Sequence, residues 1–243
     1  MLEPMREPRD GSYTLAVEGS TYEGSVALLR AREDKSQADV IAERTLHAEE
    51  GGVPRAGRGE RLMPAISECL RDGKIEGSAV ARIVCGAGPG SFTSLRVAAS
   101  IAKGLAAGYG VDLFAVSSLL LTVTGAQPLV PHGEYLSVLD AMRGEFFVSR
   151  IVVGPDGVAA ETEPPSLISA AQLEELELRE RTLKVIGPGQ QIDAHPHARG
   201  VAPILRSLLE AGPVDLASWE PDYGRRAEAQ VRWEAAHGRP LAT

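Results

Sequence analysis

The chain has 243 residues, of which 44% are hydrophobic, and this is enough for one large domain or two small ones. Its net charge of -8 argues against a protein that holds nucleic acid by itself, because such proteins neutralise phosphates with basic side chains. The two cysteines, Cys69 and Cys85, are too few for a disulfide framework and indicate reduced, buried thiols. The charged, proline-containing start does not resemble a signal peptide, and no apolar run reaches the length of a membrane span. We therefore expect a cytoplasmic protein with no membrane partner.

The first hundred residues predict strands, a helix and then a strand followed by a helix. Short β-rich runs at 13–17 and 25–29 enclose the turn 18–21, which is typical of a hairpin. Residues 40–46 predict a third strand, 47–59 an exposed glycine-rich loop and 61–70 a helix with apolar residues at helical spacing. Residues 81–85 predict a buried strand that leads through glycines into a helix at 92–107.

A second, shorter series follows. Residues 111–116 predict a strand, Ser117 and Ser118 the N-cap of a helix at 119–123, and 135–140 and 146–153 two further strands. Ser169 opens a helix with Leu173, Leu176 and Leu178 as its apolar set. A strand at 183–186 and helices at 203–209 and 225–236 complete the series. We expect Trp219 and Trp233 to anchor the last helix on the core.

The alternation of strands and helices indicates an α/β fold with a partly parallel sheet, and its repetition indicates two lobes. We place the boundary after residue 115, which gives a first lobe at 1–115 and a smaller second lobe at 116–243. The last helix is expected to pack back on the first lobe.

The glycine-rich junction at 86–91 fails three catalytic templates. A P-loop needs a Lys-Ser/Thr pair after its last glycine, where this chain has Ser91-Phe92. A dinucleotide-binding fingerprint needs a third glycine, which this chain lacks in either register. A nucleophile elbow would need glycines at the positions of Pro89 and Thr93. Two interpretations stay open: close packing of a helix on a strand, or anion binding at the helix N-terminus. The candidate phosphate or nucleotide contacts are Glu18, Ser20, Gly88, Gly90 and Asp140.

The helix after the junction is rich in small residues, and it can lie against its own sheet, against a second subunit, or against both on opposite faces. His195-Pro196-His197 lacks further ligands at metal-binding spacing, so we interpret it as an exposed loop and expect no metal site.

Residues 88–97, GPGSFTSLRV, and 102–106, AKGLA, closely resemble the motif GPGSFTGLRIG…AKGLA of the bacterial TsaB (YeaZ) family. Residues 15–21, 25–29, 116–119 and 139–145 resemble the family's LAIDTST, SVAL, VSSL and IDARRGE segments in the same order. The likeness runs from about residue 13 to about 150 and is weaker beyond, where 221–225 resembles a terminal PxYxR. Glu18 and Gly19 stand where the family has Asp and Thr, which weakens a nucleotide-binding interpretation, and Ser94 replaces a motif glycine.

The resemblance implies a two-lobed actin-like ATPase (RNase H-like) fold and a subunit without catalytic residues of its own. The related TsaD proteins carry iron-binding histidines in an HxxxH pattern after the following strand, and this chain has Ser117 to Thr122 there. The implied function is activation of threonylcarbamoyl transfer to adenosine 37 of tRNAs that read codons beginning with A. The implied partners are TsaD, the ATPase TsaE and a second copy of the chain, with tRNA bound only through the complex.

The expected partner interface is the start of the motif helix, at Ser91, Phe92, Leu95, Arg96, Ala99 and Lys103. No cofactor is expected to bind the chain tightly, while ATP or ADP and magnesium belong to the complex. An alternative is a nucleotide-binding ATPase, or a protease that acts on its partner, with Glu18, Ser20 and Asp140 as its polar set.

Overall fold

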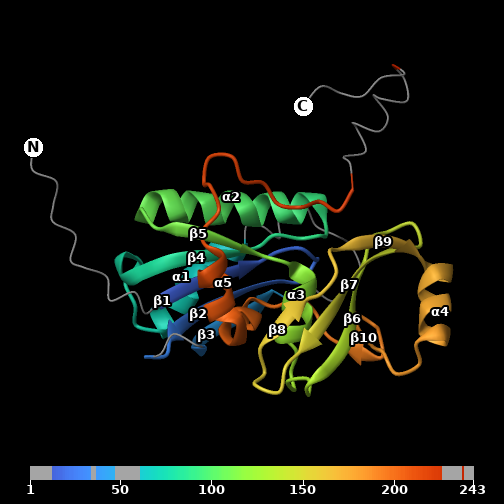
Figure 1. Ribbon diagram of the computed structural model, residues 1–243. Helices are drawn as coiled ribbons and strands as arrows, with labels where there is room; N and C mark the ends of the chain where they lie inside the picture. Colours follow the sequence, from blue (N-terminus) through green and yellow to red (C-terminus); the bar gives the residue numbers. More distant parts are fainter. Residues whose placement is uncertain (1–12, 34–36, 47–60, 226–236, 238–243) are drawn as a thin grey trace, which may run out of the picture.

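The computed structural model describes residues 13–33, 37–46, 61–225 and 237. They form two sheets with helices on their outer faces and between them (Figure 1). The predicted loop at 47–59, the helix at 225–236 beyond Arg225, and Trp233 lie outside the described residues.

The first sheet has five strands in the order β3-β2-β1-β4-β5. Their bounds are Tyr13–Glu18 (β1), Gly24–Ala31 (β2), Ala38–Leu46 (β3), Val80–Gly86 (β4) and Asp112–Val116 (β5). The first three strands pair antiparallel, and β1, β4 and β5 run parallel to one another. The predicted hairpin and the buried strand before the glycines are therefore confirmed.

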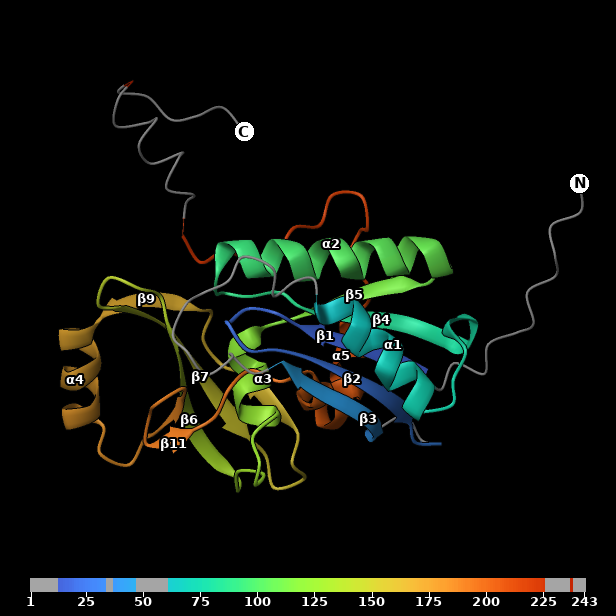
Figure 2. The same ribbon diagram turned by 180° about the vertical axis from the view of Figure 1, so that it is seen from behind.

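Two helices cover one face of this sheet, α1 (Leu62–Asp72) and α2 (Phe92–Tyr109) (Figure 2). Leu15 and Val17 of β1 point to this face, while Ala16 between them points to the other, as the two-residue period of a strand requires. Ala98, Ala102 and Ala106 of α2 pack into the same core. Small side chains every four residues let this helix lie close to the sheet. A short 3-10 turn, η2 (Gly77–Ala79), leads into β4.

The second sheet has the order β11-β10-β6-β7-β8, and β9 also pairs with β7. The strands are Gly133–Asp140 (β6), Glu145–Val153 (β7), Ala159–Glu161 (β8), Ser166–Ser169 (β9), Lys184–Gly187 (β10) and Ile192–Asp193 (β11). The sequence pattern does not predict β8, β9 or β11. Each has at most four residues, too few to show a periodic pattern.

Helix α4 (Ala170–Arg179) covers the outer face of the second sheet, and Ser169, the residue predicted to open it, is its N-cap. Leu173 is buried and Leu176 packs against the same cluster, but Leu178 is 70% exposed. The assignment of Leu178 to the apolar face was therefore wrong, because it lies five residues beyond Leu173 and so falls outside the buried stripe.

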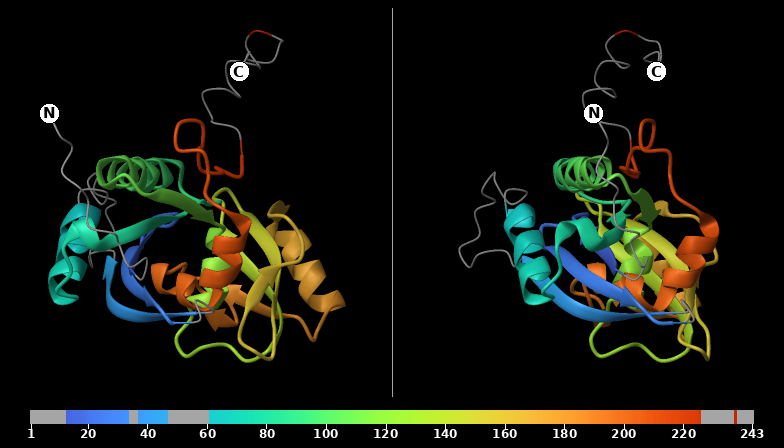
Figure 3. Two further views of the ribbon diagram at one scale, coloured as in Figure 1. Left: turned by 60° about the vertical axis from the view of Figure 1, so that its left-hand side comes forward. Right: turned by 90° about the vertical axis from the view of Figure 1, so that its left-hand side faces the viewer.

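A central layer separates the two sheets and consists of α3 (Ser118–Thr124), the 3-10 segment η3 (Ala198–Ile204) and α5 (Leu205–Ala211). Figure 3 shows α2 and α5 on opposite sides of the first sheet. The single helix predicted at 203–209 is in fact a 3-10 segment followed by α5, since Pro203 lacks the N–H that an α-helix interior uses.

The core between the sheets is shared by both. Ala16, Leu29 and Val84 come from the first sheet, Tyr135 and Ile151 from the second, and all belong to one cluster of buried side chains. The two lobes are thus joined by packing as well as by the chain.

Candidate functional site

The glycine junction lies where β4 ends and α2 begins, next to the turn that follows β1. The N–H of Ser91 donates to the carbonyl oxygen of Ser20 at 2.7 Å. A Cβ on Gly90 would lie 2.2 Å from that same oxygen, so the close approach of the two segments requires glycine.

Glu18 is the buried acidic group of this junction. It has no exposed surface, and its carboxylate accepts hydrogen bonds from the N–H of Ser20 and, at 2.9 Å, from the hydroxyl of Ser118. Burial raises the pKa of Glu18, while the hydrogen bonds from Ser20 and Ser118 act in the opposite direction. A Cβ on Gly86 would lie 1.8 Å from Oε2 of Glu18, so glycine at this position leaves room for the carboxylate.

Three backbone donors of the junction, those of Ala87, Gly88 and Ser91, have partners within the chain. The N–H of Ala87 donates to the carbonyl of Val116 at 2.7 Å, and that of Gly88 donates to the hydroxyl of Ser118 at 3.1 Å. A phosphate cradle needs N–H groups that are free to point at the ligand. In this arrangement carboxylate, hydroxyl and carbonyl groups of the chain itself occupy the place that a bound phosphate would take.

The structure brings together four of the five candidate nucleotide contacts. Glu18, Ser20, Gly88 and Gly90 meet at the junction, whereas Asp140 ends β6 of the second sheet and accepts a hydrogen bond from the N–H of Met142 at 2.7 Å. Ser118 also belongs to this junction, a position that no local sequence pattern indicates. The helix cap expected at Ser117 and Ser118 is made by Ser117, whose hydroxyl accepts from the N–H of Leu120.

The expected partner interface divides between the two faces of α2. Phe92 and Arg96 are exposed, and the Arg96 guanidinium lies 4.7 Å from the centre of the Phe92 ring. Leu95 has no exposed surface and Ala99 only 5%, so both face the core. Their assignment to a partner contact is therefore corrected, since the three- and four-residue spacing of a helix places them with Ala98 and Ala102.

The exposed face of α2 carries other residues instead. Ser100, Gly104 and Gly108 continue the line of Phe92 and Arg96 at four-residue spacing. A Cβ on Gly104 or Gly108 would meet no atom within 4 Å. Lys103 is half-buried and its ammonium group donates to the carbonyl of Trp219 at 2.8 Å. Ser91 is half-buried at the start of the helix, where its hydroxyl accepts from that of Ser94.

His197 contradicts the interpretation of residues 195–197 as an exposed loop. Its side chain is 4% exposed, its Nδ1 accepts from the N–H of Arg199, and its Nε2 lies 3.0 Å from the hydroxyl of Thr45 in β3. Burial, helped by the charge of Arg199, lowers the pKa of His197 to about 3. The segment thus packs against the first sheet, a long-range contact that no local pattern reveals.

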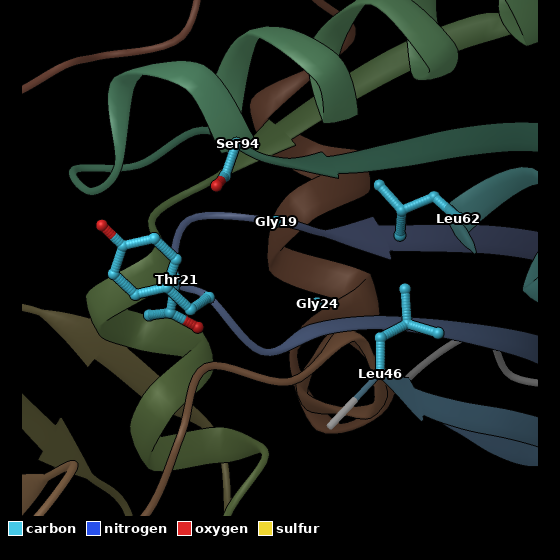
Figure 4. A pocket seen from close by; sticks show the side chains of 7 residues that line it. Gly19, Thr21, Gly24, Leu46, Leu62 and Ser94 are labelled. Carbon is cyan, nitrogen blue, oxygen red and sulfur yellow. The ribbon is translucent and has the colours of Figure 1, made fainter. Parts of the chain in front are cut away.

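A small pocket of about 30 Å³ lies beside the junction, between the turn after β1 and the first turns of α1 and α2 (Figure 4). Its lining residues are Gly19, Thr21, Tyr22, Gly24, Leu46, Leu62 and Ser94. This pocket has room for little more than a water molecule, whereas ligand pockets usually measure about 300–1,000 Å³.

Two further findings concern the described residues only. They contain no group of three or more His, Cys, Asp or Glu side chains placed to hold a metal ion. Within the same ranges, no helix has the length and apolar character needed to cross a bilayer.

Comparison with known proteins identifies a family model and several relatives that are similar to this chain. The family model of TsaD, tRNA N6-adenosine threonylcarbamoyltransferase, matches residues 36–184. The chain is 26% identical over 242 residues to the tRNA threonylcarbamoyladenosine biosynthesis protein TsaB of Bacillus subtilis, covering 90% of this chain and 96% of that protein. It is 33% identical over 138 residues to TsaB of Haemophilus influenzae, covering 57% of this chain and 53% of that protein.

The fold has a close counterpart among solved structures. YeaZ from Pseudomonas aeruginosa superposes with a TM-score of 0.66 at 22% identity, covering 87% of this chain and 99% of that one. The predicted two-lobed actin-like fold is therefore confirmed. The chain belongs to the TsaB (YeaZ) family.

Proposed function

We propose that this chain takes part in the biosynthesis of tRNA threonylcarbamoyladenosine as a subunit that binds and activates a TsaD-type catalytic partner. The proposal of this pathway rests on the relatives named tRNA threonylcarbamoyladenosine biosynthesis protein TsaB. The observation that carries the role is the exposed line on α2 at Phe92, Arg96, Ser100, Gly104 and Gly108, whose last three members present almost no side chain. Such a flat face allows another helix to approach closely.

Within this proposal the partner surface consists of Ser91, Phe92, Arg96 and the three small residues that follow. The transfer reaction, to adenosine 37 of tRNAs reading codons that begin with A, belongs to the partner. A TsaE-type ATPase joins the same assembly, with ATP or ADP and magnesium bound at the level of the complex. A second copy of this chain occupies the α2 face when the partner is absent, and tRNA is held by the complex.

The test is co-purification of the full chain with a TsaD-type partner. Ser100→Arg places a long charged side chain on the α2 face and is expected to abolish the complex, while the chain alone stays folded by circular dichroism. Ser100→Ala keeps the face flat and should retain the complex. Ser207→Arg, on the exposed side of α5, adds the same charge elsewhere and should have no effect. A complex that survives Ser100→Arg with unchanged affinity contradicts the interface.

Reconstitution of the tRNA modification then separates an activator from a passive binder. The product should form at least tenfold faster with the wild-type chain than without it, if the chain contributes about 1.4 kcal/mol or more to the catalytic step. Equal rates with and without the chain contradict the proposed role.

The alternative is an ATPase or a protease that uses Glu18, Ser20 and Asp140. The internal hydrogen bonds of the junction and the separate position of Asp140 argue against it. Calorimetric titration of the isolated chain with ATP and magnesium distinguishes the two. Saturable binding with turnover supports the alternative and removes the scaffold role.

A further inference from the structure

The segment after α5 runs along α2 toward its N-terminal end (Figure 1). The N–H of Val214 donates to the carbonyl of Leu113 in β5 at 2.9 Å. Trp219 packs against the core under α2, and its carbonyl accepts the hydrogen bond from Lys103. These contacts bring residues 221–225 to the glycine junction.

The first half of residues 221–225 is attached to the first lobe. Pro221 is buried, and the N–H of Asp222 donates to the carbonyl of Ala87 at 2.7 Å. A Cβ on Gly88 would lie 2.1 Å from the carbonyl oxygen of Asp222, which shows how closely the two backbones meet. The ring of Tyr223 lies against that of Phe92 with centroids 4.5 Å apart, in the range of a favourable aromatic pair.

The second half is attached to the second lobe. Gly224 has a φ of +67°, and its Cβ would lie 2.3 Å from Phe147 and 2.8 Å from Pro89. Its backbone therefore lies close to a β7 side chain and to Pro89 of the junction, and although the residue is exposed, both its conformation and this close approach require glycine. The Arg225 guanidinium lies 3.7 Å from the Glu145 carboxylate and 5.8 Å from the centre of the Phe147 ring.

These two attachments are separate from the core that the lobes share. Phe147 belongs to a small cluster with Leu119, Leu139 and Ala141, apart from the large cluster between the sheets. The five residues thus add a further connection between the first sheet and the second sheet. Because they are consecutive, one attachment keeps the other at a high local concentration.

We propose that residues 221–225 act as a strap that holds the two lobes in one relative position and fixes the first turn of α2 to that arrangement. Loss of either attachment frees the lobes to move about their shared core. The position of the first turn of α2 then depends on contacts that residues 221–225 make in the other lobe, with Glu145 and Phe147. The strap is a property of the isolated chain and needs no partner.

The test measures the distance between the lobes in the full chain. Spin labels are attached at Arg71→Cys on α1 and Leu178→Cys on α4, both exposed positions. The native Cys69 and Cys85 are buried, and burial raises the pKa of Cys69 to about 11, so neither competes for the label. Tyr223→Leu removes the aromatic pair with Phe92, and Arg225→Gln removes the ion pair with Glu145. Arg206→Gln is the matched control, since it breaks an exposed ion pair on α5 outside the strap.

We expect the wild type and Arg206→Gln to give one narrow distance distribution. The Tyr223→Leu, Arg225→Gln double variant should broaden it and raise amide exchange in Glu145–Val153 about fivefold, the combined effect expected of one aromatic pair and one exposed ion pair. The exchanged pair Glu145→Arg, Arg225→Glu, made with Tyr223 in place, keeps an ion pair at this position and should give a distribution close to that of the wild type. The substituted side chains are half-buried, so circular dichroism checks that each variant is folded.

Two results overturn the strap. In the first, amide exchange rises in 221–225 while the distance distribution and β7 stay as in the wild type, which means that the segment detaches without effect on the lobes. In the second, no exchange rate changes, which means that the contacts carry no stability. Neither result bears on co-purification with a TsaD-type partner, so failure of the strap and failure of the proposed function are distinguishable.

Discussion

At the scale of single residues, two buried polar side chains, Glu18 and His197, make contacts between segments that are far apart in the chain. Glu18 fills the junction with its own carboxylate and Gly86 leaves the room for it. His197 joins residues 195–199 to β3 through Thr45. Neither environment could be predicted, because each depends on groups about 70 to 150 positions away in the chain. The sequence did indicate that Glu18 and the glycines matter, since strand ends and tight turns have local signatures.

His197 predicts a pH dependence of stability. Its pKa of about 3 in the folded chain lies below the value of about 6.5 in an unfolded one, so between these limits the unfolded state binds more protons. The stability due to the neutral imidazole is therefore complete above about pH 6.5 and is lost as the pH falls toward about 3. The charge of Arg199 also lowers this pKa, and Arg199 pairs with Glu43.

The measurement is urea denaturation of wild type and His197→Gln from pH 7 to pH 4. The wild type should lose on the order of 2–3 kcal/mol more than the variant over this range. Glu18 has a raised pKa and contributes with the opposite sign, but it is common to both proteins and cancels in the difference. The exposed His132→Gln is the control. If the free energy of unfolding changes with pH equally in the wild type and in His197→Gln, the lowered pKa of His197 is contradicted.

At the scale of elements, the motif helix shows what a pattern can and cannot tell. Its start after the glycines and its end at Gly110, which has a φ of +61°, follow from local rules. Small residues occur on both of its faces, so the sequence could not decide which face meets the sheet. Tertiary packing determines the orientation of the helix: Leu95 and Ala99 are buried, whereas Ser100 and Gly104 are exposed.

The two glycines Gly86 and Gly104 predict opposite effects of the same substitution. Gly86→Ala at the end of β4 forces a methyl group against the Glu18 carboxylate and should lower the free energy of unfolding by about 1–3 kcal/mol. Gly104→Ala in open space on α2 should raise it by up to about 1 kcal/mol, because alanine favours a helix.

Chemical denaturation of the isolated chain measures both variants, with Gly104→Ala serving as the matched control for Gly86→Ala. The pair Glu18→Ala, Gly86→Ala should lose less than the sum of its single variants, since removal of the carboxylate makes room for the methyl group. A Gly86→Ala variant as stable as the wild type would mean that the carboxylate does not occupy this place.

At the scale of the whole molecule, the two lobes behave as parts of one core. Side chains from both sheets and from α3 form a single cluster, so we expect one cooperative unfolding transition. Leu121 of α3 is 1% exposed within it. Leu121→Ala should cost about 2–5 kcal/mol and lower amide protection in both sheets.

Calorimetry and amide exchange of the Leu121→Ala variant provide the measurement. Leu178→Ala is the control, because Leu178 is 70% exposed and its loss should change stability by less than about 0.5 kcal/mol. Two separate transitions, with only one of them shifted by Leu121→Ala, would show that the lobes unfold independently.

The sequence by itself determined most of the longer elements, their order and the family. The hairpin, the strand before the glycines, the motif helix and the cap at Ser169 all depend on neighbours within a few residues, which is the range of turn, cap and periodicity rules. Only the tertiary structure decided which face of α2 is exposed, that His197 is buried against β3, and that residues 221–225 join the lobes. The physical reason is that these features arise from packing and hydrogen bonds between segments far apart in the chain, for which local composition carries no signal.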